Sequence, residues 1–382
     1  MPEGGRRGIA QQEALRPIAL RCLAQLVPDG AQTPELGWLS ALHGEPFQPA
    51  AVGRARRVPH PGDRALARLA EALGLSDAEL TACALVLAAE LDVRVARAVA
   101  SLQGVAGGAG PALPTLGLLA RLAVQCDLVP ETEDARAASA LLAGPAFASG
   151  LLHLSREGRG AAEGTVAMPL ALVAALGGGG PHDRVHAAEF GVLSAEPLPA
   201  PDWSLPTPLV QRLAALAAEA ARRPDSVVIV RAPGVDEAKP MAALLARTMG
   251  RQPVAIAGPA AGTHGHGPAR PGAGLEPWLT VIEGVPVIAL DAAPGEVWTL
   301  PAFHWHRGPV LVAAGAEGEV EAGARTRIEF TVPWPSIAER AEVLRARLPV
   351  DGTGMPGHCI DGLARRTRVG LAVLHRIAEA VG

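Results

Sequence analysis

The sequence predicts an α/β protein in which a helical N-terminal half precedes a parallel sheet. From residue 226 onward, short runs rich in Val and Ile alternate with helical segments, as strands do in a parallel sheet. Residues 64–142 instead repeat apolar side chains at helical spacing. The proline-rich segment 181–208 separates these two patterns, and we expect it to be a linker between domains.

The bulk composition indicates a protein with a large core and little affinity for nucleic acid. The chain has 382 residues, enough for two or three domains, and 49% of them are hydrophobic. The formal net charge of −4 and the absence of Tyr favour neither phosphate binding nor base stacking. The four cysteines form no CxxC pair, and no apolar run is long enough to span a bilayer. We therefore expect a soluble, cytoplasmic protein without a signal peptide.

The N-terminal half is expected to contain an irregular segment and then a helical domain. Residues 1–63 are rich in Pro and Gly and contain one predicted helix, within 12–26. In the domain at 64–180, the predicted helices span 64–73, 77–90, 93–102, 114–124, 133–142 and 171–176, and the predicted strands span 151–154 and 165–168. Helices followed by a small hairpin are typical of a winged-helix-like domain.

Winged helices often bind DNA, so the charges of the predicted hairpin matter. Its turn carries Arg156 and Arg159, but also Glu157 and Glu163. The helix at 77–90, which begins with a capping box, shows no basic stripe. We therefore predict that nucleic acid is not the partner, and a DNA-binding regulator stays open as an alternative.

The C-terminal half is predicted to be an α/β core, 209–334, followed by a helical lid, 335–382. The predicted strands span 226–230, 253–257, 285–290, 309–314 and 327–332, with helices at 209–222 and 275–283. The lid helices are predicted at 336–348, 358–367 and 370–381. Ligands of such a sheet are expected at the carboxyl ends of its strands.

A strand, a loop and a helix follow one another in residues 226–250, SVVIVRAPGVDEAKPMAALLARTMG. We expect the loop at 231–240 and the helix from Met241 to Thr248. This is the layout of a phosphate-binding P-loop, G-x-x-x-x-G-K-[ST], in which backbone N–H groups surround the phosphates and the lysine reaches the terminal ones. With Lys239 as that lysine, the candidate nucleotide-binding residues are Gly234, Val235, Asp236, Glu237, Ala238, Lys239 and Pro240.

The chemistry of this motif is damaged. Pro233 and Ala238 stand at the two glycine positions, and Pro240 stands where a hydroxyl should hold magnesium. Asp236 and Glu237 would repel a triphosphate by roughly 1 kcal/mol or more for each close contact. The sequence therefore predicts a nucleotide-binding fold with a broken site, while an ordinary strand–turn–helix remains an open alternative.

Two further positions correspond to catalytic residues of P-loop ATPases. Asp291 ends an apolar strand, in the place of the Walker B aspartate, but Ala292 and Ala293 follow it where a carboxylate should polarise water. The polar sensor expected after the fourth strand is missing from residues 313–315. Arg307 precedes that strand and is a candidate arginine finger, with a plain surface arginine as the alternative.

Histidines form two H-x-H pairs, His264 with His266 and His304 with His306. Two such pairs are able to bind a metal ion. Both pairs lie in expected loops without an accompanying pattern of Cys, Asp or Glu, and we predict no metal site.

The C-terminal half resembles an AAA+ ATPase module. The resemblance rests on the P-loop layout at 227–245, the strand that ends in Asp291, the strand-to-lid junction IEFTVPWPSIAERAEVLRARL at 328–348, and the lid-like helices at 360–382. Residues 74–103 and the following hairpin are similar to the winged-helix region of bacterial ATP-binding proteins that carry two AAA+ modules in tandem. Some of those proteins accompany phage-tail-like contractile injection systems.

The resemblance implies a degenerate, non-hydrolysing AAA+ module that assists assembly or regulation of a larger AAA+ machine. Its partners would be proteins or other AAA+ subunits, its cofactor would be ATP with magnesium, and no membrane is involved. An active remodelling ATPase that uses Lys239 and Asp291 is the alternative. The DNA-binding regulator is the third, weaker reading.

Overall fold

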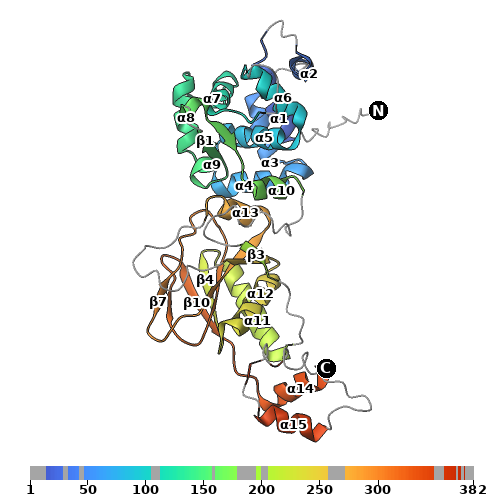
Figure 1. Cartoon of the computed structure of the whole chain (residues 1–382), viewed down its shortest axis with the longest axis vertical. Coiled ribbons are helices and arrows are strands. Elements are labelled where there is room, and N and C mark those ends of the chain that lie inside the picture. Colours follow the sequence, from blue (N-terminus) through green and yellow to red (C-terminus); the bar gives the residue numbers. More distant parts are fainter. Residues whose placement is uncertain are drawn as a thin grey trace, which may run out of the picture. The chain divides into compact units, whose positions relative to one another are not determined.

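The computed structural model describes residues 14–28, 33–42, 47–104, 112–156, 160–178, 195–198, 205–256, 272–347, 357–366, 369–370 and 374 (Figure 1). The chain divides into two compact units. The first contains Met1–Asp183 and Ala273–Val281, and the second contains Arg184–Gly272 and Ile282–Gly382. No helix in the described part of the chain is both long and apolar enough to cross a bilayer.

The first unit is built mainly from helices. They are α1 (Leu15–Ala24), α2 (Pro34–Ala41), α3 (Pro49–Arg57), α4 (Arg64–Leu73), α5 (Asp77–Leu91), α6 (Val93–Leu102), α7 (Leu116–Gln125), α8 (Asp134–Ala143), α9 (Pro145–Ala148), α10 (Leu170–Leu176) and α13 (Leu275–Val281). The predicted helices of 64–180 all exist, with bounds within two residues of those expected. Helix α5 is the centre of this unit, because twelve of its fifteen residues are buried.

Two helices of the first unit contradict the prediction that residues 29–63 are irregular. Both α2 and α3 begin with a proline, which is compatible with the first turn of a helix because its missing N–H would have no partner there. Thr33 caps α2 by accepting a hydrogen bond from the Leu36 amide at 3.3 Å. In α3, Ala51, Val52 and Ala55 are buried. The prolines of this segment therefore begin helices, whereas the sequence analysis takes them as a sign of irregular structure.

The predicted hairpin is present in the first unit. Strand β1 (His153–Ser155) pairs antiparallel with β2 (Thr165–Ala167), with Leu154 opposite Val166. Thr115 adds an isolated antiparallel bridge to Thr165, just before α7. Glu157 and Arg159, two of the charges that we assigned to the turn, lie outside the described residues.

Helix α13 belongs to the first unit, although we predicted it within the α/β core at 209–334. It packs against α4 and α10. Leu275, Trp278 and Leu279 are buried, and an Arg68 side-chain nitrogen is 3.4 Å from the Val281 carbonyl, to which it donates. The segment between two strands of the second unit therefore supplies a helix to the first.

The second unit contains a six-stranded sheet with the order β10-β4-β8-β6-β5-β3. The strands are β3 (Ala195–Pro197), β4 (Ser226–Arg231), β5 (Gln252–Ile256), β6 (Gly284–Leu290), β8 (Val310–Ala314) and β10 (Thr326–Thr331). All neighbours are parallel except β3, which pairs antiparallel with β5 at the edge. The five strands predicted for the core are confirmed. Strand β3 corrects our reading of 181–208 as linker alone, since an edge position tolerates its proline.

Helices cover one face of this sheet. Figure 1 shows α11 (Thr207–Arg222) beside α12 (Val235–Thr248), and both contribute to a buried cluster with Val228, Val230 and Leu311. The lid helices α14 (Ile337–Arg347) and α15 (Gly357–Arg366) contribute to the same cluster. The final predicted helix, 370–381, lies mostly outside the described residues, within which Leu374 is helical.

A small two-stranded parallel sheet, β7 (Val297–Thr299) with β9 (Glu319–Glu321), was not expected. Each strand has only three residues, which is too short for a clear alternation of polar and apolar side chains. Strand β7 precedes β8 in the sequence and β9 follows it, so their pairing holds the segments before and after β8 together.

Candidate functional site

The candidate site lies where β4, β8 and β6 end. The Ala232 amide donates to the Ala314 carbonyl at 3.1 Å, and the Gly315 amide donates to the Leu290 carbonyl at 3.4 Å. Asp291 follows β6 directly, and its Oδ1 lies 3.7 Å from the point that a Cβ on Gly315 would occupy. The three strand ends therefore meet at one edge of the sheet, as expected for ligand-binding positions in a parallel sheet.

The predicted loop at 231–240 is wrong. Strand β4 ends at Arg231 and α12 begins at Val235, so only Ala232, Pro233 and Gly234 connect them. The Glu237 and Ala238 amides both donate to the Gly234 carbonyl, at 3.0 and 3.2 Å, and are therefore part of the helix.

The composition of the segment explains this early helix start. No glycine stands between 235 and 240 to favour an open loop, and Asp236 and Glu237 interact favourably with the positive end of the helix dipole. Pro240 removes one internal N–H without ending the helix. A segment without glycine is therefore helical where the P-loop prediction expects an open loop.

Lys239, the only lysine in the chain, lies in the second turn of α12. Its Nζ is 3.4 Å from Oδ1 of Asp236, three residues earlier on the same helix; the Asp236 side chain is exposed and Lys239 is partly exposed. A P-loop lysine instead points at phosphates held by the preceding loop. The structure thus gives Lys239 a surface ion pair, the kind that contributes about 0–1 kcal/mol.

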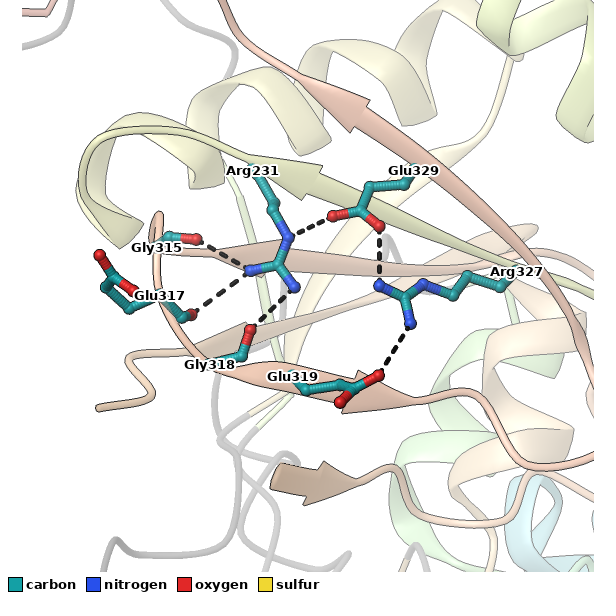
Figure 2. A network of polar contacts seen from close by, with 7 residues as sticks. All are labelled: Arg231, Gly315, Glu317, Gly318, Glu319, Arg327 and Glu329. Atoms are coloured by element: carbon teal, nitrogen blue, oxygen red, sulfur yellow. Dashed lines mark hydrogen bonds and ion pairs between the residues drawn. The ribbon is translucent and has the colours of Figure 1, made fainter. Parts of the chain in front are cut away.

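Sequence reasoning missed a polar network at this edge of the sheet (Figure 2). Arg231, the last residue of β4, donates from Nε to the carboxylate of Glu329 on β10. Its two terminal nitrogens donate to the turn after β8, to the carbonyls of Gly315 at 3.2 Å, Glu317 at 3.4 Å and Gly318 at 3.0 Å. The guanidinium thus connects β4, β10 and the β8–β9 turn.

A second arginine completes the network. Arg327 donates to the other oxygen of Glu329 at 2.7 Å and lies 3.6 Å from Glu319. Burial alone would raise the pKa of Glu329, but the hydrogen bonds from Arg327 and Arg231 outweigh it and hold that pKa below its ordinary value. No local sequence signal could have identified this network, because its members come from three separate segments.

Asp291 is exposed and lies beside Gly315. The carboxylate of Glu296 accepts a hydrogen bond from the Ala293 amide at 2.9 Å, so it folds back on its own turn. The described residues contain no group of three or more His, Cys, Asp or Glu placed to hold a metal ion.

Arg307 lies at the opposite edge of the sheet from Asp291. It is exposed and precedes β8 by three residues, whereas Asp291 follows the carboxyl end of β6. The structure therefore does not bring Arg307 and Asp291 together within one chain.

The second H-x-H pair is divided between solvent and interior. His304 is exposed and His306 is buried. Burial, and secondarily the charge of Arg325, lower the pKa of His306 to about 4. Arg325 holds this turn in place by donating to the carbonyls of His306 and Gly308, each at 2.8 Å. The first pair, His264 and His266, lies outside the described residues.

Comparison of the chain with protein-family models, with curated proteins and with solved structures found no significant match.

Proposed function

We propose that this chain is a degenerate AAA+ module that does not hydrolyse ATP and that assists the assembly or regulation of a larger AAA+ machine. The strand order supports the resemblance in the sequence. Strand β8 lies between β4 and β6, so the P-loop, sensor and Walker B positions fall on adjacent strand ends. In an ATPase, the residues at these three positions contact the same nucleotide, so the strands that carry them must be neighbours in the sheet.

One observation carries the non-hydrolysing part of the proposal, namely that α12 begins at Val235. The residues from Val235 to Pro240 are helical, and their first turn contributes two carboxylates where a phosphate cradle needs free N–H groups. The described residues therefore do not fit a magnesium-bound triphosphate. Ala292 and Ala293 follow Asp291, so the residue type that polarises water is also lacking there.

The charges of α7 and α8 in the first unit favour a protein partner over DNA. Arg136 on α8 lies 3.5 Å from Glu133, and Arg121 on α7 lies 3.6 Å from Asp134. Each cation of this helix pair is thus accompanied by a carboxylate, whereas a DNA-binding face presents clustered positive charge to phosphates.

Equilibrium titration of the full chain with a fluorescent ATP analogue and magnesium tests the proposal. We expect no saturable binding up to millimolar nucleotide, for the wild type and for Lys239→Ala alike. Micromolar binding that is lost in Lys239→Ala would contradict the proposal and support the active ATPase.

The single lysine provides a second readout on the same protein. Apart from the α-amino group, only Lys239 can react with an amine-selective acylating reagent, and its modification is resolved by peptide mass spectrometry. We expect magnesium–ATP to leave the rate of Lys239 acylation unchanged. Protection of Lys239 by ATP but not by AMP would indicate that phosphates contact this side chain.

A further inference from the structure

Two of the cysteines, Cys22 and Cys126, meet in the interior of the first unit. Cys22 lies in the last turn of α1, and Cys126 directly follows the last residue of α7. Cys22 is 0% exposed and Cys126 is 3% exposed, so both side chains are shielded from solvent. The two residues are 104 positions apart in the sequence, so the fold, and not local chain geometry, brings them together.

The end of α1 explains one part of this contact. The last carbonyls of a helix lack the amide partners that regular helical spacing would supply. The Cys22 carbonyl accepts from the Gln25 amide at 3.1 Å, and it also accepts from the Cys126 thiol, whose Sγ lies 3.8 Å away. The Cys126 side chain thus takes part in capping α1.

The backbone at the end of α7 holds Cys126 in this position. The Cys126 amide donates to the Leu122 carbonyl at 3.0 Å, and the Leu128 amide donates to the Ala123 carbonyl at 2.9 Å. Asp127, between them, has a φ of 49°, in the left-handed region that commonly ends a helix. A closed, hydrogen-bonded turn therefore presents the Cys126 thiol to α1.

The two cysteine side chains also contact each other. A hydrogen bond with the Cys126 side chain, and secondarily burial, raise the pKa of Cys22 above its ordinary range. Cys22 is therefore a neutral thiol at neutral pH and reacts slowly with oxidants. Cys83, on α5, is buried in the same unit, but its pKa is raised by burial and by the charge of Glu79, with no contribution from another cysteine.

We propose that Cys22 and Cys126 are a redox modification site, at which hydrogen peroxide converts the two thiols into one disulfide. One thiol is oxidised to a sulfenic acid, and the first water leaves. The sulfur of the other thiol then displaces the hydroxyl group, which leaves with the thiol proton as the second water. The two electrons that the sulfurs lose reduce the O–O bond of the peroxide. This site lies outside the α/β core and does not depend on the function proposed for that core.

The disulfide joins α1 to the end of α7 and closes a loop that contains the helices from α2 to α6. Helix α5, the centre of the unit, lies within this loop and packs against α1. A cross-link restricts the unfolded chain more than the folded one, and its effect grows with the length of the loop. Oxidation should therefore stabilise the first unit and leave the α/β sheet of the second unit unchanged.

Peptide mass spectrometry of the full chain, after prolonged treatment with hydrogen peroxide and blocking of the remaining thiols, tests the pairing. In the folded chain we expect the Cys22–Cys126 link to exceed every other pairing by about tenfold or more, because the fold raises the local concentration of these two thiols. In the chain unfolded by urea, loop closure favours Cys83 with Cys126, only 43 residues apart, over Cys22 with Cys126 by about fourfold. The unfolded distribution in the folded chain would overturn the proposal. Oxidation of Cys359 without a Cys22–Cys126 link would overturn it as well.

Hydrogen–deuterium exchange measures the effect of the disulfide on the first unit. In the oxidised wild type we expect the amides of α5 to exchange about tenfold or more slowly than in the reduced protein, and a dithiol reductant should restore the original rate. Peptides from β4 and β8 should exchange at the same rate in both forms. Equal slowing in the two units would contradict the proposal, and so would an unchanged rate in α5 after the disulfide has formed.

Single substitutions by alanine identify the sulfurs that are responsible. Cys22→Ala and Cys126→Ala each remove one member of the pair, so either change should abolish both the link and the slowing of exchange in α5. Cys83→Ala is the matched control, because it removes a buried thiol of the same unit and should retain both effects. An oxidant effect on α5 that persists in Cys126→Ala would refute the disulfide. The comparison of folded and unfolded wild type needs no substitution, so it decides the pairing even if a variant folds poorly.

Discussion

Replacing Arg231 by Met should destabilise the α/β unit more than the same change at Arg327, although both arginines bind the carboxylate of Glu329. The Arg231 side chain is 12% exposed, and the Arg327 side chain is 38% exposed. Arg231 also donates to three backbone carbonyls of the β8–β9 turn, whereas the contacts of Arg327 among the described residues are with the side chains of Glu319 and Glu329. Met keeps most of the aliphatic length and removes the charge.

The expected magnitude follows from the number and kind of bonds lost. A hydrogen bond involving a charged group contributes about 1.5–3 kcal/mol, and the turn carbonyls can regain water at this edge of the sheet. In this variant the Glu329 carboxylate still accepts a hydrogen bond from Arg327, so it keeps one cationic partner. We therefore expect Arg231→Met to cost about 2–3 kcal/mol. Arg327→Met, which breaks more exposed ion pairs, should cost about 0.2–1 kcal/mol.

Amide exchange of peptides that cover β4, β8 and β10 measures this difference within the full chain. The cost for Arg231→Met corresponds to exchange that is about 30- to 140-fold faster, since each 1.4 kcal/mol is a factor of ten. For Arg327→Met we expect less than about sixfold. If the two variants accelerate exchange equally, the carbonyl bonds of Arg231 contribute nothing and the argument from burial is wrong.

The ion pairs of Glu329 with Arg231 and Arg327 predict that the stability of the protein depends on pH. The folded state lowers the pKa of Glu329, so its contribution to stability is present above the unfolded pKa of about 4.3 and is lost as the pH falls through the folded value. Between pH 5 and pH 3 the wild type should lose more stability than Arg231→Met. A parallel loss in both proteins would mean that Arg231 does not stabilise the ionised carboxylate.

Two further predictions concern single buried groups. Glu79 is 4% exposed, and its carboxylate accepts from the amides of Ser76 at 2.8 Å and Ala146 at 2.9 Å. Glu79→Gln should lower the free energy of unfolding, measured by urea titration, by about 1–3 kcal/mol, because the new side-chain NH2 group would replace an acceptor of one of these two amides. As a control, Glu71→Gln changes an exposed side chain and should be nearly neutral. His306, whose folded pKa is about 4, stays neutral while the unfolded histidine gains a proton, so stability should fall as the pH drops from about 6.5 to 4. His306→Gln should lack this slope and His304→Gln should retain it.

The strands and most helices were predictable from the sequence because their signals are local. Apolar periodicity located α4 to α8 and the five parallel strands. The predictions based on proline were wrong where proline occupies the first turn of a helix, as at Pro34 and Pro49. They were also wrong in the edge strand β3, which contains a proline.

The candidate site was less predictable, for two physical reasons. At 235–240 the P-loop pattern predicts a loop, but a segment without glycine and with two acidic residues at its start favours a helix. The contacts of Arg231 join segments far apart in the chain, and one sequence gives no sign of such pairings.

The excursion of α13 into the first unit has a consequence for the covalent topology of the protein. The backbone passes between the units at residues 183–184, at 272–273 and again at 281–282. A single protease cut within 181–208 would therefore separate residues 1–183 from the rest of the chain covalently, while α13 would stay attached to the second unit and keep its packing on α4 and α10. A fragment that ends at Asp183 would lack the helix that packs on α4 and α10 and would expose their apolar surface. Dissection of this chain into separately folding parts requires residues 273–281 to be transferred with the first unit.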